Sequence, residues 1–285
     1  MAALKPAQVA EYTAETGEHK AHNSTLTVLI LGFLAGAYIA LGYLLYIRVT
    51  AAAPEAWGSM TGFVGALVFP VGLTLVLVAG GELLTGNMMA LSLARITQKI
   101  TTREVFRNLG LVTVANFVGA LFVAYFFGHV LGLTGQGVYL DKVVDLAGHK
   151  IEDPFLNAYI SGIGCNWLVA LAVWLAYAAD SMTAKIIGLW IPTTAFVALG
   201  FQHVVANMFL IPAAIFEGHY SWGEYLANFV PVWLGNLTGG AVFVAGAYYA
   251  AYLYKTTDKK VAVPADETAD KNTNANSAPI QSIAK

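Results

Sequence analysis

The sequence predicts an all-α membrane protein with six transmembrane helices, built as two inverted three-helix repeats in which the second and fifth helices are interrupted. Three observations predict this fold class. Hydrophobic residues make up 58% of the 285 residues and charged residues only 11%, against about a quarter in soluble domains. Several charge-poor stretches are long enough to cross a bilayer. Short motifs also recur at a fixed distance along the chain, as expected for two related halves.

Charged residues divide the chain into six charge-poor stretches. A hydrocarbon core of roughly 30 Å needs about 20 helical residues, because each residue rises about 1.5 Å along a helix. Every stretch reaches that length, so six transmembrane helices are predicted. The stretches cover residues 21–47, 56–94, 108–140, 154–179, 186–216 and 225–254, and only Glu82 interrupts the second.

The second and fifth stretches are longer than one span needs and carry polar residues near their middle. Gly80 and Gly81 lie before Thr85 in the second stretch. Gly200 lies before His203 in the fifth. Glycine accepts backbone angles that a helix interior forbids. We therefore predict that each of these helices is broken into two half-helices, and the backbone groups left unpaired at a break must face protein or a water-filled path.

The two halves share a repeated motif. The segment GELLTGN around Glu82 and Asn87 matches FQHVVAN around Gln202 and Asn207, with an offset of 120 residues at both positions. Because each half contains three spans, the second half enters the membrane from the opposite side. Further matches, at offsets of 120 and 129, link 116–120 with 236–240 and, more weakly, 37–41 with 166–170.

Basic residues are distributed unequally between the two sides of the predicted membrane. Sorting by alternate loops places 12 Lys and Arg on one side and three on the other. Since basic residues are retained in the cytoplasm, both termini are predicted to face it. The predicted divisions are an N-terminal cytoplasmic segment, 1–24, expected as a surface helix; a six-helix transmembrane domain, 25–254; and a disordered cytoplasmic tail, 255–285, too polar to bury a core.

Charge balance and cysteine content exclude several classes of protein. There are 15 Lys and Arg against 17 Asp and Glu, so no basic excess is available to neutralise nucleic-acid phosphates. Cys165 is the only cysteine, which rules out an intramolecular disulfide and leaves at most one soft metal ligand. No nucleic-acid partner, metal or other cofactor is predicted.

The two breaks point to a site for a small anion. Half-helices are expected to begin near Asn87 and Asn207, and such N-termini carry free N–H groups and positive partial charge. They would favour an anion without a permanent charge that holds it too tightly for release. His203 is the only histidine near the middle of a span. It can donate a proton to a weak-acid anion or stabilise its charge, or it can be a hydrogen-bonded core histidine.

Other candidate residues have both a structural and a functional interpretation. Glu82 costs about 3 kcal/mol inside a bilayer, so it is expected to anchor loop N–H groups rather than line a path. Thr85 and Asn207 can contact an anion or satisfy loose backbone groups. Lys150 lies in the long loop 141–155, and its position alone predicts a solvent-exposed charge. Four apolar residues near the breaks can narrow a pore or simply pack: Phe69, Leu73, Leu84 and Phe196.

These motifs resemble the formate/nitrite transporter family. The resemblance covers residues 1–254 and implies an aquaporin-like fold, a homopentamer with one pore per protomer, and passage of small monovalent anions such as formate and nitrite across a lipid bilayer. The segments that carry it are GELLTGN at 81–87, CNWLVALAVW at 165–174, GFQHVVANMFLIP at 200–212 and NFVPVWLGNLTGG at 228–240.

The resemblance also implies roles for particular residues. Thr85, His203 and Asn207 match the family's residues on the substrate pathway, and Lys150 matches a vestibule lysine that attracts anions. One position departs from the family, which usually has Glu where this chain has Gln202. An amide can still anchor the loop, but if the usual Glu tunes the basicity of the histidine, that tuning is missing here. The positions matching constriction-forming aromatics are Phe69 and Phe196.

The resulting hypothesis is a channel for small monovalent weak-acid anions, formate first, in the bacterial inner membrane, and not an enzyme. Its central His203 hydrogen-bonds or protonates the anion. The alternatives are a nitrite channel or proton-coupled symporter of the same family, a membrane-embedded histidine-ligated redox protein, and a pore for neutral solutes. The redox alternative needs a second buried histidine or carboxylate facing His203, and the neutral-solute pore leaves Lys150 unused.

Overall fold

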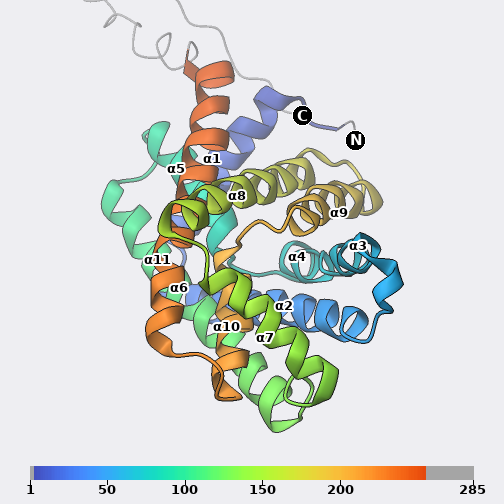
Figure 1. Cartoon of the computed structure of the whole chain (residues 1–285). Helices are drawn as coiled ribbons and strands as arrows, with labels where there is room; N and C mark the ends of the chain where they lie inside the picture. Colours follow the sequence, from blue (N-terminus) through green and yellow to red (C-terminus); the bar gives the residue numbers. More distant parts are fainter. Residues whose placement is uncertain (1–2, 255–285) are drawn as a thin grey trace, which may run out of the picture.

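The computed structural model describes residues 3–254, and its regular structure is helical, with no strand in this part of the chain (Figure 1). The predicted all-α class is confirmed, while the tail prediction for 255–285 lies outside the described residues. The α-helices are α1 Pro6–His22, α2 Thr25–Thr50, α3 Ser59–Val68, α4 Val71–Thr74, α5 Leu84–Ile96, α6 Thr102–Phe122, α7 Gly137–Ile151, α8 Phe155–Ala178, α9 Met182–Ala198, α10 Val204–Phe216 and α11 Trp222–Thr238. A 3₁₀ turn, η1 Glu55–Trp57, and the π-helical segments η2 Leu75–Ala79, η3 Val123–Val130, η4 Gly239–Gly246 and η5 Tyr249–Leu253 complete the described elements.

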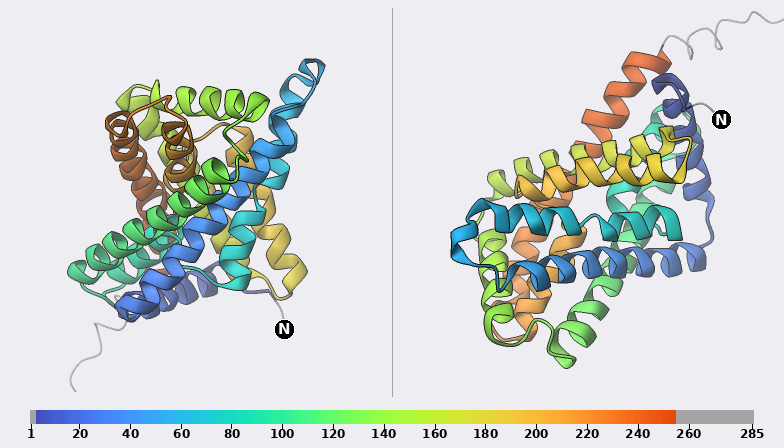
Figure 2. Two further views of the ribbon diagram at one scale, coloured as in Figure 1. Left: turned by 90° about the horizontal axis from the view of Figure 1, so that it is seen from below. Right: turned by 90° about the vertical axis from the view of Figure 1, so that its right-hand side faces the viewer.

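Apolar helices long enough to cross a membrane recur along the chain. The two shorter apolar helices α9 and α10 follow one another and together fit a further span, so the arrangement is compatible with six. The helices α2, α3 and α9 lie side by side (Figure 2). The five long apolar runs in the described chain are Thr25–Thr50, Ser59–Ala79, Thr102–Val130, Phe155–Ala178 and Trp222–Leu253.

The second and fifth spans are interrupted, as the sequence predicts. Residues 80–83 separate η2 from α5, and residues 199–203 separate α9 from α10. Gly80 (φ 102°) and Gly200 (φ 73°) take left-handed backbone angles at the start of these connections. Thr85 lies in the first turn of α5 rather than in the connection itself. Each break therefore directs the start of a new half-helix into the protein.

In the first half, a buried asparagine fastens the break. Asn116, on α6, donates from Nδ2 to the carbonyl oxygens of Gly32 (2.8 Å) and Glu82 (2.9 Å). Its Oδ1 accepts the first free N–H of α5, from Leu84 (2.9 Å). Lipid offers no partner for these backbone groups, so the side chain supplies one.

The second half repeats this arrangement. Asn236, on α11, donates to the carbonyl oxygens of Gly162 (2.8 Å) and Gln202 (3.0 Å) and accepts from the N–H of Val204 (2.9 Å). The two sets of contacts confirm the offset of 120 at the breaks. For the first helix of each half the matching carbonyls belong to positions 32 and 162, an offset of 130. The offset of 129 inferred for residues 37–41 and 166–170 is therefore wrong by one residue.

The charged segment before the fourth span is a helix and not the loop expected over 141–155. In α7, Val143, Ala147 and Gly148 are buried, and the helix packs against α10. Charged side chains occupy its remaining faces, so its apolar stripe is too narrow to stand out in a scan for charge-poor stretches. Lys150 lies in its last turn.

The N-terminal helix is more buried than the expected surface helix. Val9, Ala10 and Ala14 are buried against neighbouring helices, and α1 contacts α5, α8 and η5. The two ends of the described chain therefore meet at one end of the molecule. Lys99, which the sequence places on the same side as the N-terminal segment, pairs with Glu18 of α1 at 3.0 Å.

Candidate functional site

A buried pair of side chains, one from each half, lies where the two breaks meet. The ring Nε2 of His203 is 3.0 Å from Thr85 Oγ1, and its Nδ1 accepts the N–H of Ala206 at 3.1 Å, so that the ring caps α10. His203 is 2% exposed and Thr85 is fully buried. The starts of α5 and α10 therefore converge on one polar contact, which is the convergence predicted from the repeat.

The contacts of His203 define its hydrogen positions. A backbone N–H can only donate, so Nδ1 of His203 carries no hydrogen while it accepts from Ala206. The hydrogen of the neutral ring is then on Nε2 and points to Thr85 Oγ1. This assignment follows from the hydrogen-bond network. It leaves the hydroxyl hydrogen of Thr85 free to be donated to another acceptor.

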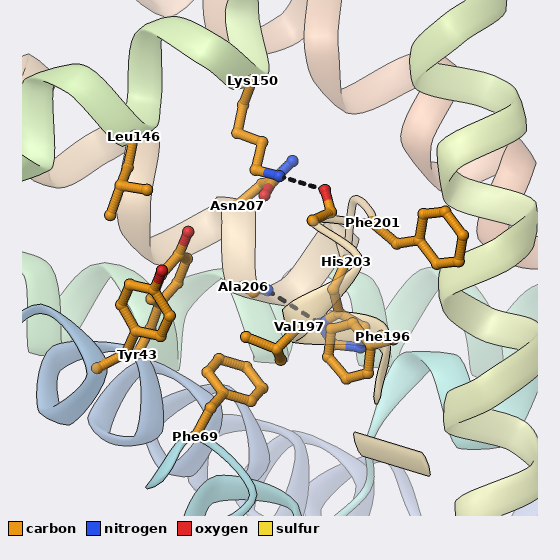
Figure 3. Close-up of a pocket in the computed structure, with 12 residues that line it drawn as sticks. Tyr43, Phe69, Leu146, Lys150, Phe196, Val197, Phe201, His203, Ala206 and Asn207 are labelled. Atoms are coloured by element: carbon orange, nitrogen blue, oxygen red, sulfur yellow. Dashed lines mark hydrogen bonds between the residues drawn. The ribbon is translucent and has the colours of Figure 1, made fainter. Parts of the chain in front are cut away.

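A cavity of about 80 Å³, here called the Lys150 cavity, extends from Lys150 to His203 (Figure 3). A single water needs about 10–15 Å³ on this measure, so the cavity has room for a small ion with little water. Asn207 also lines it. Most of the wall is aromatic or aliphatic, and an anion that enters must lose much of its hydration shell. The aromatic members of the wall are Tyr43, Tyr46, Phe69, Phe196 and Phe201.

Lys150 places an ammonium group at one end of this cavity. Its Nζ donates to the carbonyl oxygen of Gly200 at 2.8 Å (Figure 3). An ammonium has three N–H donors, so two remain for other acceptors. Burial lowers the pKa of Lys150 from the ordinary lysine value, although the nearby Cys165 and Asp153 act in the opposite direction. The side chain is thus held by a protein carbonyl and still faces the cavity.

The four proposed constriction residues do not lie together. Phe69 and Phe196 contact edge to face with ring centroids 5.7 Å apart, and the Phe196 centroid is 5.8 Å from that of His203 (Figure 3). This pair narrows the Lys150 cavity beside the histidine. Leu73 lines a different cavity. Leu84 lines neither of these two cavities and is fully buried in the core.

A second cavity of about 10 Å³, here called the Lys20 cavity, lies on the α5 side of the central pair. It has room for about one water. Leu83 and Gly86, which line it, flank Thr85 closely in the chain, whereas His203, the partner of Thr85, lines the Lys150 cavity. Further lining residues are Lys20, Leu73, Val76 and Asn87.

Glu82 is held by side chains, whereas backbone N–H groups were the expected partners. Its Oε2 accepts from Lys20 Nζ (2.9 Å) and Asn87 Nδ2 (2.7 Å), and its Oε1 accepts from Asn23 Nδ2 (3.3 Å). The carboxylate is 4% exposed, and the ammonium of Lys20 compensates its charge. A buried carboxylate without such a partner would be strongly unfavourable.

Gln202 and Asn207 hold the equivalent place in the second half. Asn207 Nδ2 donates to Gln202 Oε1 and Asn228 Oδ1, both at 2.9 Å. Gln202 Nε2 donates to Asp153 Oδ2 at 2.6 Å. Asn207 therefore lines the Lys150 cavity while its amide nitrogen is engaged in holding the connection between α9 and α10.

Several residues of the site were missed by inspection of the sequence. Asn108 and Asn228 complete the two polar clusters and are 120 residues apart. Lys20 was counted only as a basic flank, although it precedes Lys150 by 130 residues. Asp153 was read as one of several loop charges. Extending the comparison of the two halves to these offsets would have found the first three.

The interrupted membrane helices meet at a buried polar pair, and a cavity with a cationic end lies beside this pair. This arrangement defines a multi-pass membrane transport protein. The model of the formate/nitrite transporter family matches residues 7–250. Over 260 residues, covering 91% of this chain and 100% of the relative, the sequence is 54% identical to the formate channel BtFdhC of Bacillus thuringiensis. The chain belongs to the formate/nitrite transporter family.

Solved structures agree with this assignment. An FNT family ion channel superposes with a TM-score of 0.80 at 31% identity, covering 86% of this chain and 98% of the other. A pentameric formate channel with formate bound superposes with a TM-score of 0.70 at 30% identity, covering 80% and 98%. These relatives are transport channels and not enzymes.

Proposed function

We propose that this chain forms a channel for small monovalent weak-acid anions, with formate as the first substrate. One observation carries the proposal: a single cavity with aromatic walls links the cation of Lys150 to His203, whose Nε2 contacts the hydroxyl of Thr85. The names of BtFdhC and of the solved pentameric channel with bound formate support formate as the substrate.

Passage in this proposal has three stages. Lys150 draws the anion into its cavity by charge. The rings of Phe69 and Phe196 then replace part of its hydration shell. At the centre, the hydroxyl of Thr85, oriented by His203, donates a hydrogen bond to the dehydrated anion, and the positive ends of α5 and α10 act in the same direction. Because no permanent charge lies at the centre, the anion is released quickly.

Hydrogen bonding rather than proton donation by His203 fits this geometry better. A second ring proton would have to sit on Nδ1, directly opposite the N–H of Ala206, and the capping contact would be lost. Donation of the only proton, on Nε2, would produce an imidazolate, which is far too basic to form here. The symport alternative therefore needs a proton route other than His203, and nitrite stays an alternative substrate.

The redox alternative conflicts with the same contacts. Both ring nitrogens of His203 are engaged, with Thr85 and with Ala206, so binding a haem iron would break one of these hydrogen bonds. Within the described residues, the ring contacts the hydroxyl of Thr85, the backbone N–H of Ala206 and the phenyl ring of Phe196. None of these is the second buried histidine or carboxylate that this alternative requires.

We further propose a homopentamer in a bacterial inner membrane, with both termini in the cytoplasm and residues 25–254 forming the channel domain. The solved pentameric relative supports the assembly. The contact between α1 and η5, together with the pairing of Lys99 with Glu18 of α1 and the excess of basic residues that the sequence assigns to this side, supports the orientation. Native mass measurement and reporter fusions to each end test the two points.

The test of function is ion flux through the purified, full-length protein in proteoliposomes. Formate and nitrite influx are recorded at two pH values, with glycerol-driven swelling as the control for a neutral-solute pore. We expect formate flux well above empty vesicles and little glycerol entry. Negligible flux of both anions would refute the proposal, and a large preference for nitrite would transfer it to the alternative substrate. A visible absorption spectrum of the same preparation tests the redox alternative.

A further inference from the structure

The two lysines at equivalent places in the halves have different partners. Lys20 Nζ forms a salt bridge with the carboxylate of Glu82 at 2.9 Å. Lys150, 130 residues later, donates instead to a backbone carbonyl and forms no salt bridge within the described part of the chain. The residue equivalent to Glu82 is Gln202, which has no charge to offer.

A second difference accompanies the first. In the first half, the amide of Asn23 donates to the carboxylate of Glu82 at 3.3 Å. In the second half, the amide of Gln202 donates to the carboxylate of Asp153 at 2.6 Å. Position 153 follows position 23 by 130 residues, the offset that also relates the two lysines. The amide and the carboxylate have therefore exchanged places between the two halves.

The hydrogen bonds of Gln202 explain why the two differences belong together. Its Oε1 accepts from Asn207 (2.9 Å) and Asn228 (2.8 Å), and its Nε2 donates to Asp153 (2.6 Å) and to the carbonyl of Lys150 (3.4 Å). All four hydrogen-bonding positions of the amide are used. A carboxylate at 202 would place an oxygen against Asp153 Oδ2 with no hydrogen between them, so Asp153 makes an amide at 202 necessary.

We propose that Asp153 is the counter-charge of the second half, displaced from position 202, and that Gln202 keeps it apart from Lys150 so that the ammonium stays open to the incoming anion. The Lys150 cavity is then the higher-affinity entrance, whereas Lys20 is neutralised by direct contact with Glu82. Asp153 and Gln202 are positioning residues that set the strength of anion capture. This inference rests on the proposed role of Lys150 in attracting the substrate.

The experiment is a double-mutant cycle on the full-length protein, read by thermal stability in detergent and by the formate concentration that gives half-maximal flux. Gln202→Glu alone creates two facing carboxylates and should strongly lower stability. Asp153→Asn alone keeps the hydrogen bond from Gln202 and should lower the half-saturating concentration. The double variant, Gln202→Glu with Asp153→Asn, reproduces the first-half arrangement.

We expect the double variant to regain the stability lost in Gln202→Glu. Its half-saturating formate concentration should be about tenfold above that of the unchanged protein, because neighbouring charges couple by amounts of this order and Lys150 is now paired directly. The mirror variant, Glu82→Gln with Asn23→Asp, is the matched control, since it gives the first half the arrangement of the second and should fold.

Two outcomes would overturn the inference. Strictly additive stability changes would mean that positions 153 and 202 have not exchanged roles. A double variant that is as stable as the unchanged protein and has the same half-saturating concentration would mean that Gln202 does not keep Lys150 free. Absence of formate flux in the unchanged protein would instead refute the proposed function, and the stability cycle would still decide the exchange.

Discussion

Replacement of Thr85 by valine isolates the hydroxyl that the site offers to an anion. Valine has nearly the same shape, so the change removes one donor and little volume. Thr85 is fully buried and lies 3.0 Å from His203 Nε2, and water therefore cannot replace the lost group. A hydrogen bond to a charged partner is worth about 1.5–3 kcal/mol, which corresponds to formate flux slower by about 10- to 150-fold if the loss falls on the central barrier.

The assay is radiolabelled formate influx into proteoliposomes, normalised to the amount of folded protein. Thr85→Ser keeps the hydroxyl and should retain most of the flux. Thr193→Val is a matched control, because Thr193 is also fully buried but donates to Leu189 within its own helix at 2.6 Å. Flux through Thr85→Val within twofold of the Thr193→Val control would contradict the reasoning, since the hydroxyl would then have no part in passage.

Three further predictions concern the capture lysine, the histidine and the asparagine that fastens the second break. Lys150→Gln should raise the half-saturating formate concentration more than it lowers maximal flux. Burial lowers the pKa of Lys150, so its charge is lost at lower pH than that of an ordinary lysine. Formate capture by the unchanged protein should therefore weaken as pH rises, and the variant should lack this part of the pH dependence. His203→Phe should abolish most formate flux and leave the pH dependence contributed by Lys150 in the remaining flux, and unchanged flux would show that the ring is only structural. Asn236→Ala removes three buried hydrogen bonds at about 1 kcal/mol or more each, so unfolding should be easier by about 3 kcal/mol. The control is Thr238→Ala, which removes a half-buried hydroxyl that contacts Leu234 and Tyr159, and a thermal midpoint in detergent equal to that of this control would count against the role of Asn236.

The asymmetry between the two lysines has a consequence for transport. A lysine paired with a carboxylate attracts an anion weakly, and Lys20 is in that state. Lys150 faces a larger cavity without a direct carboxylate contact. Anion capture is therefore expected to be stronger from the Lys150 side, and release easier toward the Lys20 side. Equivalent asparagines, Asn116 and Asn236, hold the two breaks, and the inequality comes from the side chains at positions 82 and 202.

Membrane spans, helix breaks and the repeat were determined by the sequence alone. Lipid cannot hydrogen-bond to the backbone, so spans must be apolar and helical, and glycine and polar residues clustered within an overlong span indicate a break. These are local constraints, readable within about 20 residues. The same logic placed His203 at the centre, and the offset of 120 paired the two breaks.

Only the tertiary structure decided how the side chains of the site are used. The hydrogen positions on His203 depend on Ala206 and on Thr85, which lies 118 residues away in the chain. Packing between distant helices makes α7 a helix against α10. It also buries Leu84 in the core, whereas Phe69 narrows a cavity. The salt bridge of Lys20 with Glu82, and the lack of a carboxylate partner for Lys150 among the described residues, arise in the same way. Hydrogen bonds act over about 3 Å in space and leave no fixed spacing in the chain.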